Sequence, residues 1–232
     1  MKDKINNCTT LEELFDLWKT EYEGKVFVTD GIVNSQKWNS QKVRPMFLLK
    51  DAYGGDANWN LINDHILRHL DSNVDNTWKK VTQWSYGLMN TDVNKIQPFD
   101  ENLIPKKYGN EYLQSMAIVN IKKESGKSKS VWEELEAAVE KDKDFIKREI
   151  ELIDPTVIVC GYTMGQLEKI LGVEIKKERN RNLYYYTEIN GKTVIVLDYY
   201  HPASRYPDIM NYYALVNIYQ LALKEKQKEN NL

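Results

Sequence analysis

Four short apolar runs, each ending in polar residues or glycine, constrain the fold of this 232-residue chain more than any other feature. They cover residues 43–50, 116–120, 156–161 and 193–198. Runs of this length are typical of strands that are buried on both faces of a sheet. Helical patterns over residues 131–152 and 163–171 separate the later runs. The alternation predicts an α/β fold with three layers, α/β/α, around a central, mainly parallel, four-stranded sheet.

Three further elements are expected: a helix over 11–18 that opens with the capping box Thr10–Glu13, an extra strand over 183–189, and a long amphipathic helix over 207–228. Residues 71–112 have little periodicity, so we expect loops and short helices there. Because no linker or repeat is visible, we predict one domain over residues 1–232, with residues 1–42 as a helical segment at the entrance. Within it, residues 27–34 either shape the entrance of a site or cap the sheet.

Composition limits the class of protein. Apolar residues make up 42% of the chain, which is enough for a sizeable core. The net charge of −2 is not that of a basic nucleic-acid-binding domain, so any contact with DNA must come from a local positive surface. No apolar run approaches the roughly 20 residues that span a membrane, and the first residues lack an apolar signal core. We therefore expect a cytoplasmic protein without a membrane contact.

Metal and cofactor sites are not expected. The two cysteines, Cys8 and Cys160, cannot supply the four ligands of a zinc or iron–sulfur site by themselves. His65 and His69 are spaced i,i+4 and could place two metal ligands on one helix face, but surface histidines are the simpler interpretation. The sequence predicts no metal, no iron–sulfur cluster and no cofactor.

Three polar residues follow the predicted strands: Asp51, Asn120 and His201. Ligands of parallel sheets bind at the carboxyl ends of the strands, so these side chains are candidates for one site. An acid, an amide and a histidine can orient water, read the edge of a nucleobase and stabilise a leaving group. Each also has a structural alternative, since Asp51 can cap a helix, Asn120 can form a turn and His201 can pack in a loop.

The residues around these positions resemble family-1 uracil-DNA glycosylases. Residues 49–55, Leu-Lys-Asp-Ala-Tyr-Gly-Gly, are similar to the first motif of that family, Gly-Gln-Asp-Pro-Tyr-His-Gly, with the Asp and Tyr in register. Ile-Val-Asn at 118–120 is similar to the second motif, and His-Pro-Ala-Ser-Arg at 201–205 to the third. Order and approximate spacing agree, and the motifs span about two-thirds of the chain. The resemblance implies a uracil-DNA glycosylase-like fold.

The resemblance also implies roles for single residues. Asp51 would position the water and stabilise the cationic sugar, and His201 would stabilise the departing base. Asn120 would bind the flipped base, Tyr53 would close the pocket near carbon 5, and Trp59 is the candidate for stacking on the base, with core packing as its alternative. The expected DNA contacts are Ser204, Arg205, Lys122, Lys123 and Lys127, the lysines in a loop over 122–129 that could equally be an ordinary solvated loop.

The implied function is a monomeric DNA glycosylase of base-excision repair, which flips a uracil or modified pyrimidine out of DNA and leaves an abasic site. Lys50, Ala52 and Gly54 depart from the first motif, and Arg205 replaces the leucine that wedges into the DNA. These departures leave open a glycosylase that acts on modified bases of phage DNA in host defence. A catalytically inactive nucleic-acid-binding module is the other alternative. Asn120 could also read cytosine if its amide were flipped.

Overall fold

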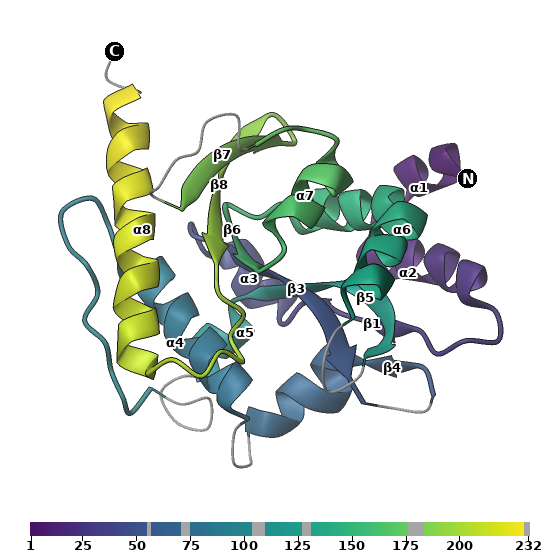
Figure 1. Ribbon diagram of the computed structural model, residues 1–232, viewed down its shortest axis with the longest axis horizontal. Coiled ribbons are helices and arrows are strands. Elements are labelled where there is room, and N and C mark those ends of the chain that lie inside the picture. The colour runs from purple at the N-terminus through teal and green to yellow at the C-terminus, as the bar shows by residue number, and fades with distance from the viewer. Residues whose placement is uncertain (55–56, 71–74, 104–109, 127–130, 176–182, 230–232) are drawn as a thin grey trace.

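A six-stranded sheet lies at the centre of the computed structural model, with helices on both of its faces (Figure 1). The structure describes residues 1–54, 57–70, 75–103, 110–126, 131–175 and 183–229. The α/β class predicted from the sequence is confirmed. No helix in these described ranges is long and apolar enough to cross a membrane.

The strands of the sheet follow the order β2-β5-β3-β6-β8-β7. Their bounds are Gly31–Ile32 (β2), Ala117–Gly126 (β5), Pro45–Tyr53 (β3), Val157–Gly161 (β6), Lys192–Tyr199 (β8) and Tyr184–Ile189 (β7). The four inner strands run parallel to one another, and the two outer strands pair antiparallel. In the described residues the sheet is therefore mixed and six-stranded, which corrects the prediction of four strands. A separate parallel pair is formed by β1 (Val28–Thr29) and β4 (Trp59–Asn60).

One face of the sheet packs against helices from the N-terminal part and the middle of the sequence. These are α1 (Lys2–Asn7), α2 (Leu11–Lys19), α6 (Trp132–Ile153) and α7 (Met164–Leu171). Helix α2 begins as predicted, because the side chain of Thr10 accepts from the backbone N–H of Glu13 and the Glu13 carboxylate accepts from that of Thr10. The bulky centre of this face is Trp18, which stacks on Phe145 of α6 at 5.0 Å between ring centroids.

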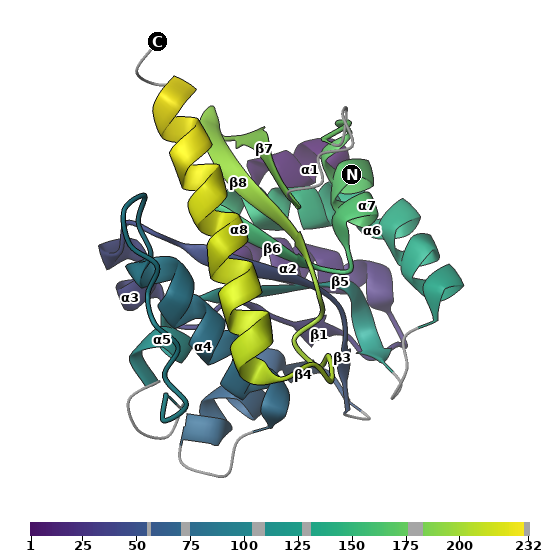
Figure 2. The ribbon, with the colours of Figure 1, turned by 60° about the vertical axis from the view of Figure 1, so that its left-hand side comes forward.

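The opposite face is covered mainly by α4 (Asn76–Asn90) and α8 (Asp208–Glu229), and Figure 2 shows α8 running beside β8. The two helices approach closely at Gly87, where a side chain would collide with Tyr212 and Val216. Helix α4 has 15 residues, so the expectation of loops and short helices over 71–112 was wrong there. Its apolar residues were hidden among polar ones, but Trp78, Val81, Trp84 and Leu88 recur at helical spacing.

The remaining described elements are short. They are η1 (Thr20–Tyr22), α3 (Ser35–Ser40), η2 (Leu61–Ile66), η3 (Leu67–Leu70) and α5 (Asn110–Gln114). Because β3, β5, β6 and β8 are parallel, their carboxyl ends meet along one edge of the sheet, where the three polar candidates are expected.

Candidate active site

The sheet register brings Asp51, Asn120 and His201 to the same edge and the same face. Asn120 pairs with Leu49 of β3, and the register places Leu49 beside Gly161 of β6. Residues paired across parallel strands point to the same face, and Leu49 belongs to the core under α4 and α8. With neighbouring strands about 4.8 Å apart, Asn120 and Gly161 are separated by roughly 10 Å. Asn120 on β5, Asp51 on β3 and His201, which follows β8 and lies beside Gly161 of β6, are thus spread along one edge over four neighbouring strands.

The positions along the strands differ from the prediction. Asp51 lies inside β3, two residues before its end, and Asn120 lies in the middle of β5. Only His201 follows its strand, β8. Strand β5 continues to Gly126 because residues 122–126 pair with the end of β3, so the predicted loop over 122–129 is a strand in its first half.

Two glycines allow the acid and the histidine to approach the neighbouring strands. A methyl group at Gly126 would collide with the carboxylate of Asp51. A methyl group at Gly161 would lie 2.8 Å from Leu49 Cδ2 and 3.4 Å from both Cα and Cδ2 of His201. A side chain at Gly126 would therefore displace the Asp51 carboxylate, whereas a methyl group at Gly161 would displace Leu49 and fill the space beside His201.

His201 begins a tight turn that fixes its imidazole. The backbone N–H of Ala203 donates to Nδ1 of His201 at 3.1 Å, and the backbone N–H of Ser204 donates to the His201 carbonyl at 2.9 Å. A neutral imidazole that accepts at Nδ1 carries its proton on Nε2. The turn therefore leaves an N–H donor at Nε2.

The same ring is held in its neutral form. Burial and, to a smaller extent, the positive charge of Lys50 together lower the pKa of His201 to about 4. At neutral pH, His201 is a hydrogen-bond donor without charge. Lys50, which the sequence marked only as a departure from the motif, therefore acts on the electrostatics of the site.

Helices α4 and α8 hold the turn in place. The ammonium group of Lys80, itself buried, donates to the carbonyl of Ser204 and lies 3.6 Å from Asp208. Asn211 Nδ2 donates to Ser204 Oγ at 3.1 Å. Ser204 is thus engaged inside the protein, whereas Arg205 is exposed beside the turn.

A ridge of three tyrosines borders His201. The Tyr200 ring lies 5.4 Å from that of Tyr162 and 5.1 Å from that of Tyr206, and we call these residues the tyrosine ridge. Tyr162 is 47% exposed and Tyr206 is 53% exposed. Tyr162 has a φ of 61°, which is rare for a bulky residue and costs backbone energy. Lys50 Nζ lies 5.7 Å from the centre of the Tyr162 ring, so a positive charge lies beside the ridge.

Asn120 is buried and engaged by Asp30, which sequence reasoning did not single out. Asp30 Oδ2 accepts from the backbone N–H of Asn120 at 2.7 Å and from its side-chain Nδ2 at 3.1 Å. Asp30 lies between β1 and β2, inside the segment 27–34 that was expected to shape the entrance or cap the sheet. The sequence offered one indication of this role, because Asp30 is an acidic residue between the apolar pairs Phe27-Val28 and Ile32-Val33.

Lys123 does not fit the DNA-contacting role predicted for it. Its side chain is fully buried, 2.5 Å from Asp30 Oδ1 and 2.9 Å from Glu149 Oε2. Burial favours the neutral amine, but the carboxylates Asp30 and Glu149 outweigh it and raise the pKa of Lys123. We correct the assignment, because an enclosed ion pair cannot contact a phosphate.

The other predicted site residues have fewer contacts that bear on their expected roles. Lys122 is paired with Glu134 of α6, and Lys127 lies outside the described residues. Tyr53 is the last residue of β3, opposite Gly126. Trp59 is half-buried, donates from Nε1 to Ser125 Oγ at 3.3 Å, and lines a pocket of about 240 Å³ with Asn58, Asn60, Asp64, Thr29, Phe27 and Lys19.

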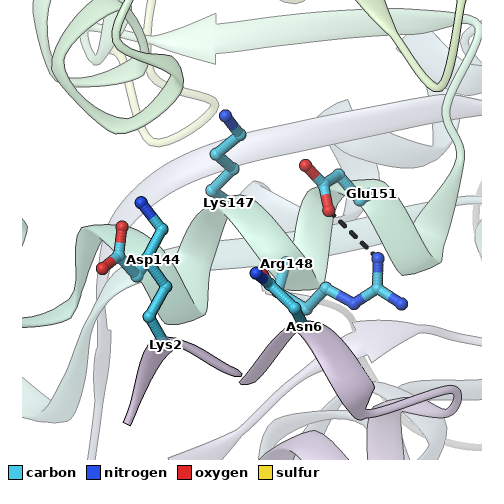
Figure 3. A pocket seen from close by; sticks show the side chains of 6 residues that line it. All are labelled: Lys2, Asn6, Asp144, Lys147, Arg148 and Glu151. Atoms are coloured by element: carbon cyan, nitrogen blue, oxygen red, sulfur yellow. Dashed lines mark hydrogen bonds and ion pairs between the residues drawn. The ribbon is translucent and has the colours of Figure 1, made fainter. Parts of the chain in front are cut away.

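A second pocket, of about 280 Å³, lies away from this edge, between α1 and α6 (Figure 3). Its lining mixes acids and bases, and Arg148 is engaged by Glu151 and by the Cys8 carbonyl. No group of three metal-ligating side chains occurs among the described residues. His65 packs edge-on between Trp59 and Trp78, at 6.3 and 6.0 Å between ring centroids.

The arrangement offers an acid, a buried amide and a neutral histidine donor along one sheet edge, with exposed aromatic and cationic residues beside them. No protein-family model matches this sequence, and no curated protein matches it significantly.

Proposed function

We propose that this protein is a DNA glycosylase that hydrolyses the bond between deoxyribose and a flipped pyrimidine base. The observation that carries the proposal is the state of His201: neutral, accepting at Nδ1, and therefore donating from Nε2. A neutral donor suits a leaving group that departs as an anion, since it stabilises the negative charge without first losing a proton. The four parallel inner strands and the motifs in their order support a uracil-DNA glycosylase-like fold.

In the proposed reaction, the bond between C1′ and the base nitrogen breaks, and its electron pair leaves with the base. His201 donates a hydrogen bond to the base oxygen on which negative charge collects. Asp51 stabilises the positive charge on the sugar and orients the water whose oxygen bonds to C1′. The proton that this water loses passes to Asp51 or to solvent. The base anion takes up a proton from solvent, so the products are a neutral free base and an abasic site.

The tyrosine ridge supports DNA as the partner. Exposed aromatic rings stack on unpaired bases irrespective of sequence, and each such contact contributes roughly 1–3 kcal/mol. Lys50 and the exposed Arg205 add positive charge beside the rings. This local surface supplies what the net charge of −2 does not.

The test uses end-labelled DNA with one uracil or one modified cytosine, followed by alkali cleavage of abasic sites. Wild type is expected to cut at one of these bases. Asp51→Asn and His201→Ala are expected to lower the rate by roughly 10²- to 10⁴-fold while the thermal unfolding midpoint shows that they fold. If the wild type releases no base from either DNA, a non-catalytic nucleic-acid-binding module replaces this proposal. Preference for the modified base would favour the host-defence alternative.

A further inference from the structure

The side chain of Asn120 can present its two polar atoms to a ligand in either of two orders, because an amide can rotate by half a turn. In one order, N–H faces an acceptor and Oδ1 faces a donor, which suits the O4 and N3–H edge of a uracil-type base. In the other order, the same site suits the amino group and N3 of cytosine. What fixes the order decides which class of base is read.

The hydrogen bonds of Asn120 allow only one of these two orientations of its amide group. A carboxylate accepts hydrogen bonds but donates none, so the side-chain atom that faces Asp30 must be the amide nitrogen. A flipped amide would set Oδ1 against Asp30 Oδ2, oxygen against oxygen, at about the present 3.1 Å. Within the part of the chain that the structure describes, the Asn120 amide makes no other hydrogen bond. Its Oδ1 and second N–H remain for a ligand.

Asp30 is itself fixed. It is fully enclosed at its side chain, its Oδ1 is paired with Lys123, and its Oδ2 also accepts from the backbone N–H of Asn120. Lys123 is held in turn by Glu149 of α6 and lies 5.1 Å from the centre of the Trp18 ring. The carboxylate therefore cannot turn away to admit the flipped amide without leaving a buried charge unpaired.

We infer that Asp30 is a positioning residue for base selection: it locks the Asn120 amide in one order, so that Asn120 accepts a base with an acceptor and an N–H donor and rejects cytosine. The inference rests on the proposed function. Rejection is strong in such a site, because the wrong base leaves buried polar groups unpaired.

The test compares Asp30→Asn with Glu149→Gln. Each removes one acidic partner of Lys123, but only the first removes the carboxylate that orients Asn120. Release of uracil and of cytosine is measured from otherwise identical DNA. Asp30→Asn is expected to lower the ratio of uracil to cytosine release by roughly tenfold or more, whereas Glu149→Gln leaves the ratio at the wild-type value. Equal ratios in the two variants overturn the inference, even where both lose activity.

Two additions keep the result decisive. If Asp30→Asn does not fold, Asp30→Asn/Lys123→Met removes the unpaired ammonium group with it and is assayed in its place. The Nδ2 protons of Asn120, followed by NMR, report the lock without catalysis: slow exchange with solvent in wild type and in Glu149→Gln, fast exchange in Asp30→Asn. Fast exchange in wild type overturns the inference. Slow exchange in a wild type that releases no base overturns the proposed function and leaves the lock of Asn120 by Asp30 standing.

Discussion

Two polar regions lie along the same sheet edge, one fully buried and one partly buried, and their ionisable groups differ in charge state. The Asp30 cluster, formed by Asp30, Asn120, Lys123 and Glu149, buries three ionisable groups and pairs them with one another. The His201 turn, residues 201–204, encloses one ionisable ring in part, and there desolvation and the nearby Lys50 keep the ring uncharged. The ion pairs of the Asp30 cluster hold its side chains in one geometry. The neutral His201 ring can instead donate a hydrogen bond to negative charge that forms on a ligand. The two regions therefore predict different consequences of mutation.

The largest effect is expected from breaking the Asp30 cluster at its centre. Lys123→Met leaves Asp30 and Glu149 buried without a counter-ion, which is expected to lower the free energy of unfolding by about 3–5 kcal/mol. The pKa of Glu149 is already raised by burial, and loss of Lys123 removes what opposes that shift. Chemical denaturation measures the change.

The neighbouring lysine is the matched control. Lys122 pairs with Glu134, whose side chain is 38% exposed, so Lys122→Met is expected to cost about 0–1 kcal/mol. If the two variants lose the same stability, Lys123 does not have the structural role assigned to it.

The next effect concerns the space beside His201. Gly161→Ala places a methyl group 2.8 Å from Leu49 Cδ2 and in contact with His201. We expect the free energy of unfolding to fall by about 1–3 kcal/mol and the rate of base release to fall as well. Gly165→Ala, in α7, has no atom within 4 Å of the new methyl group and is expected to gain about 0.5–1 kcal/mol. Unfolding curves and the alkali-cleavage assay are run on both. Unchanged release by Gly161→Ala would show that base release does not depend on the space between Leu49 and His201.

A smaller effect is expected on the surface beside the turn. Tyr162→Ala removes an exposed ring of the tyrosine ridge and is expected to weaken binding of single-stranded DNA by about 1 kcal/mol, the low end for one stacked base. Tyr162→Phe keeps the ring and should bind like wild type. Fluorescence anisotropy with a labelled oligonucleotide measures both. Equal affinity of the alanine variant and wild type would show that Tyr162 of the tyrosine ridge does not contact DNA.

The sequence predicted the framework of both regions better than their details. Unbroken apolar runs located all four inner strands, since burial on both faces leaves an unambiguous pattern. The outer strand β2 has only two residues, Gly31 and Ile32, and no pattern of that length can identify a strand. Helix α4 was missed because the residues that it buries include Lys80, Thr82, Gln83 and Ser85.

The same limit applies to the site. The order of motifs predicted Asp51, Asn120 and His201 as site residues, because each follows or lies in an apolar run that local pattern can identify as a strand. Lys123 could not be distinguished from Lys122, because adjacent residues of a strand face opposite sides and only the fold decides which side is buried. Asp30 acts on Asn120 from 90 positions away in the chain, a contact that no local pattern encodes.

The smallest and most specific effect tests why His201 is neutral. Its folded pKa, about 4, lies below the roughly 6.5 of an unfolded histidine, so protonation favours unfolding. This loss of folding stability is absent above about pH 6.5 and grows as the pH falls toward 4. Because the ring stays neutral across neutral pH, the rate of base release should not change there. Lys50→Met removes the second cause of the shift and is expected to raise the pKa of His201, while Lys50→Arg keeps the charge and leaves it low. NMR titration of the histidine ring protons measures both variants. Because burial is the larger cause, the ring should stay below its ordinary pKa in either variant; a pKa unmoved by Lys50→Met would mean that burial alone separates the His201 turn from the paired charges of the Asp30 cluster.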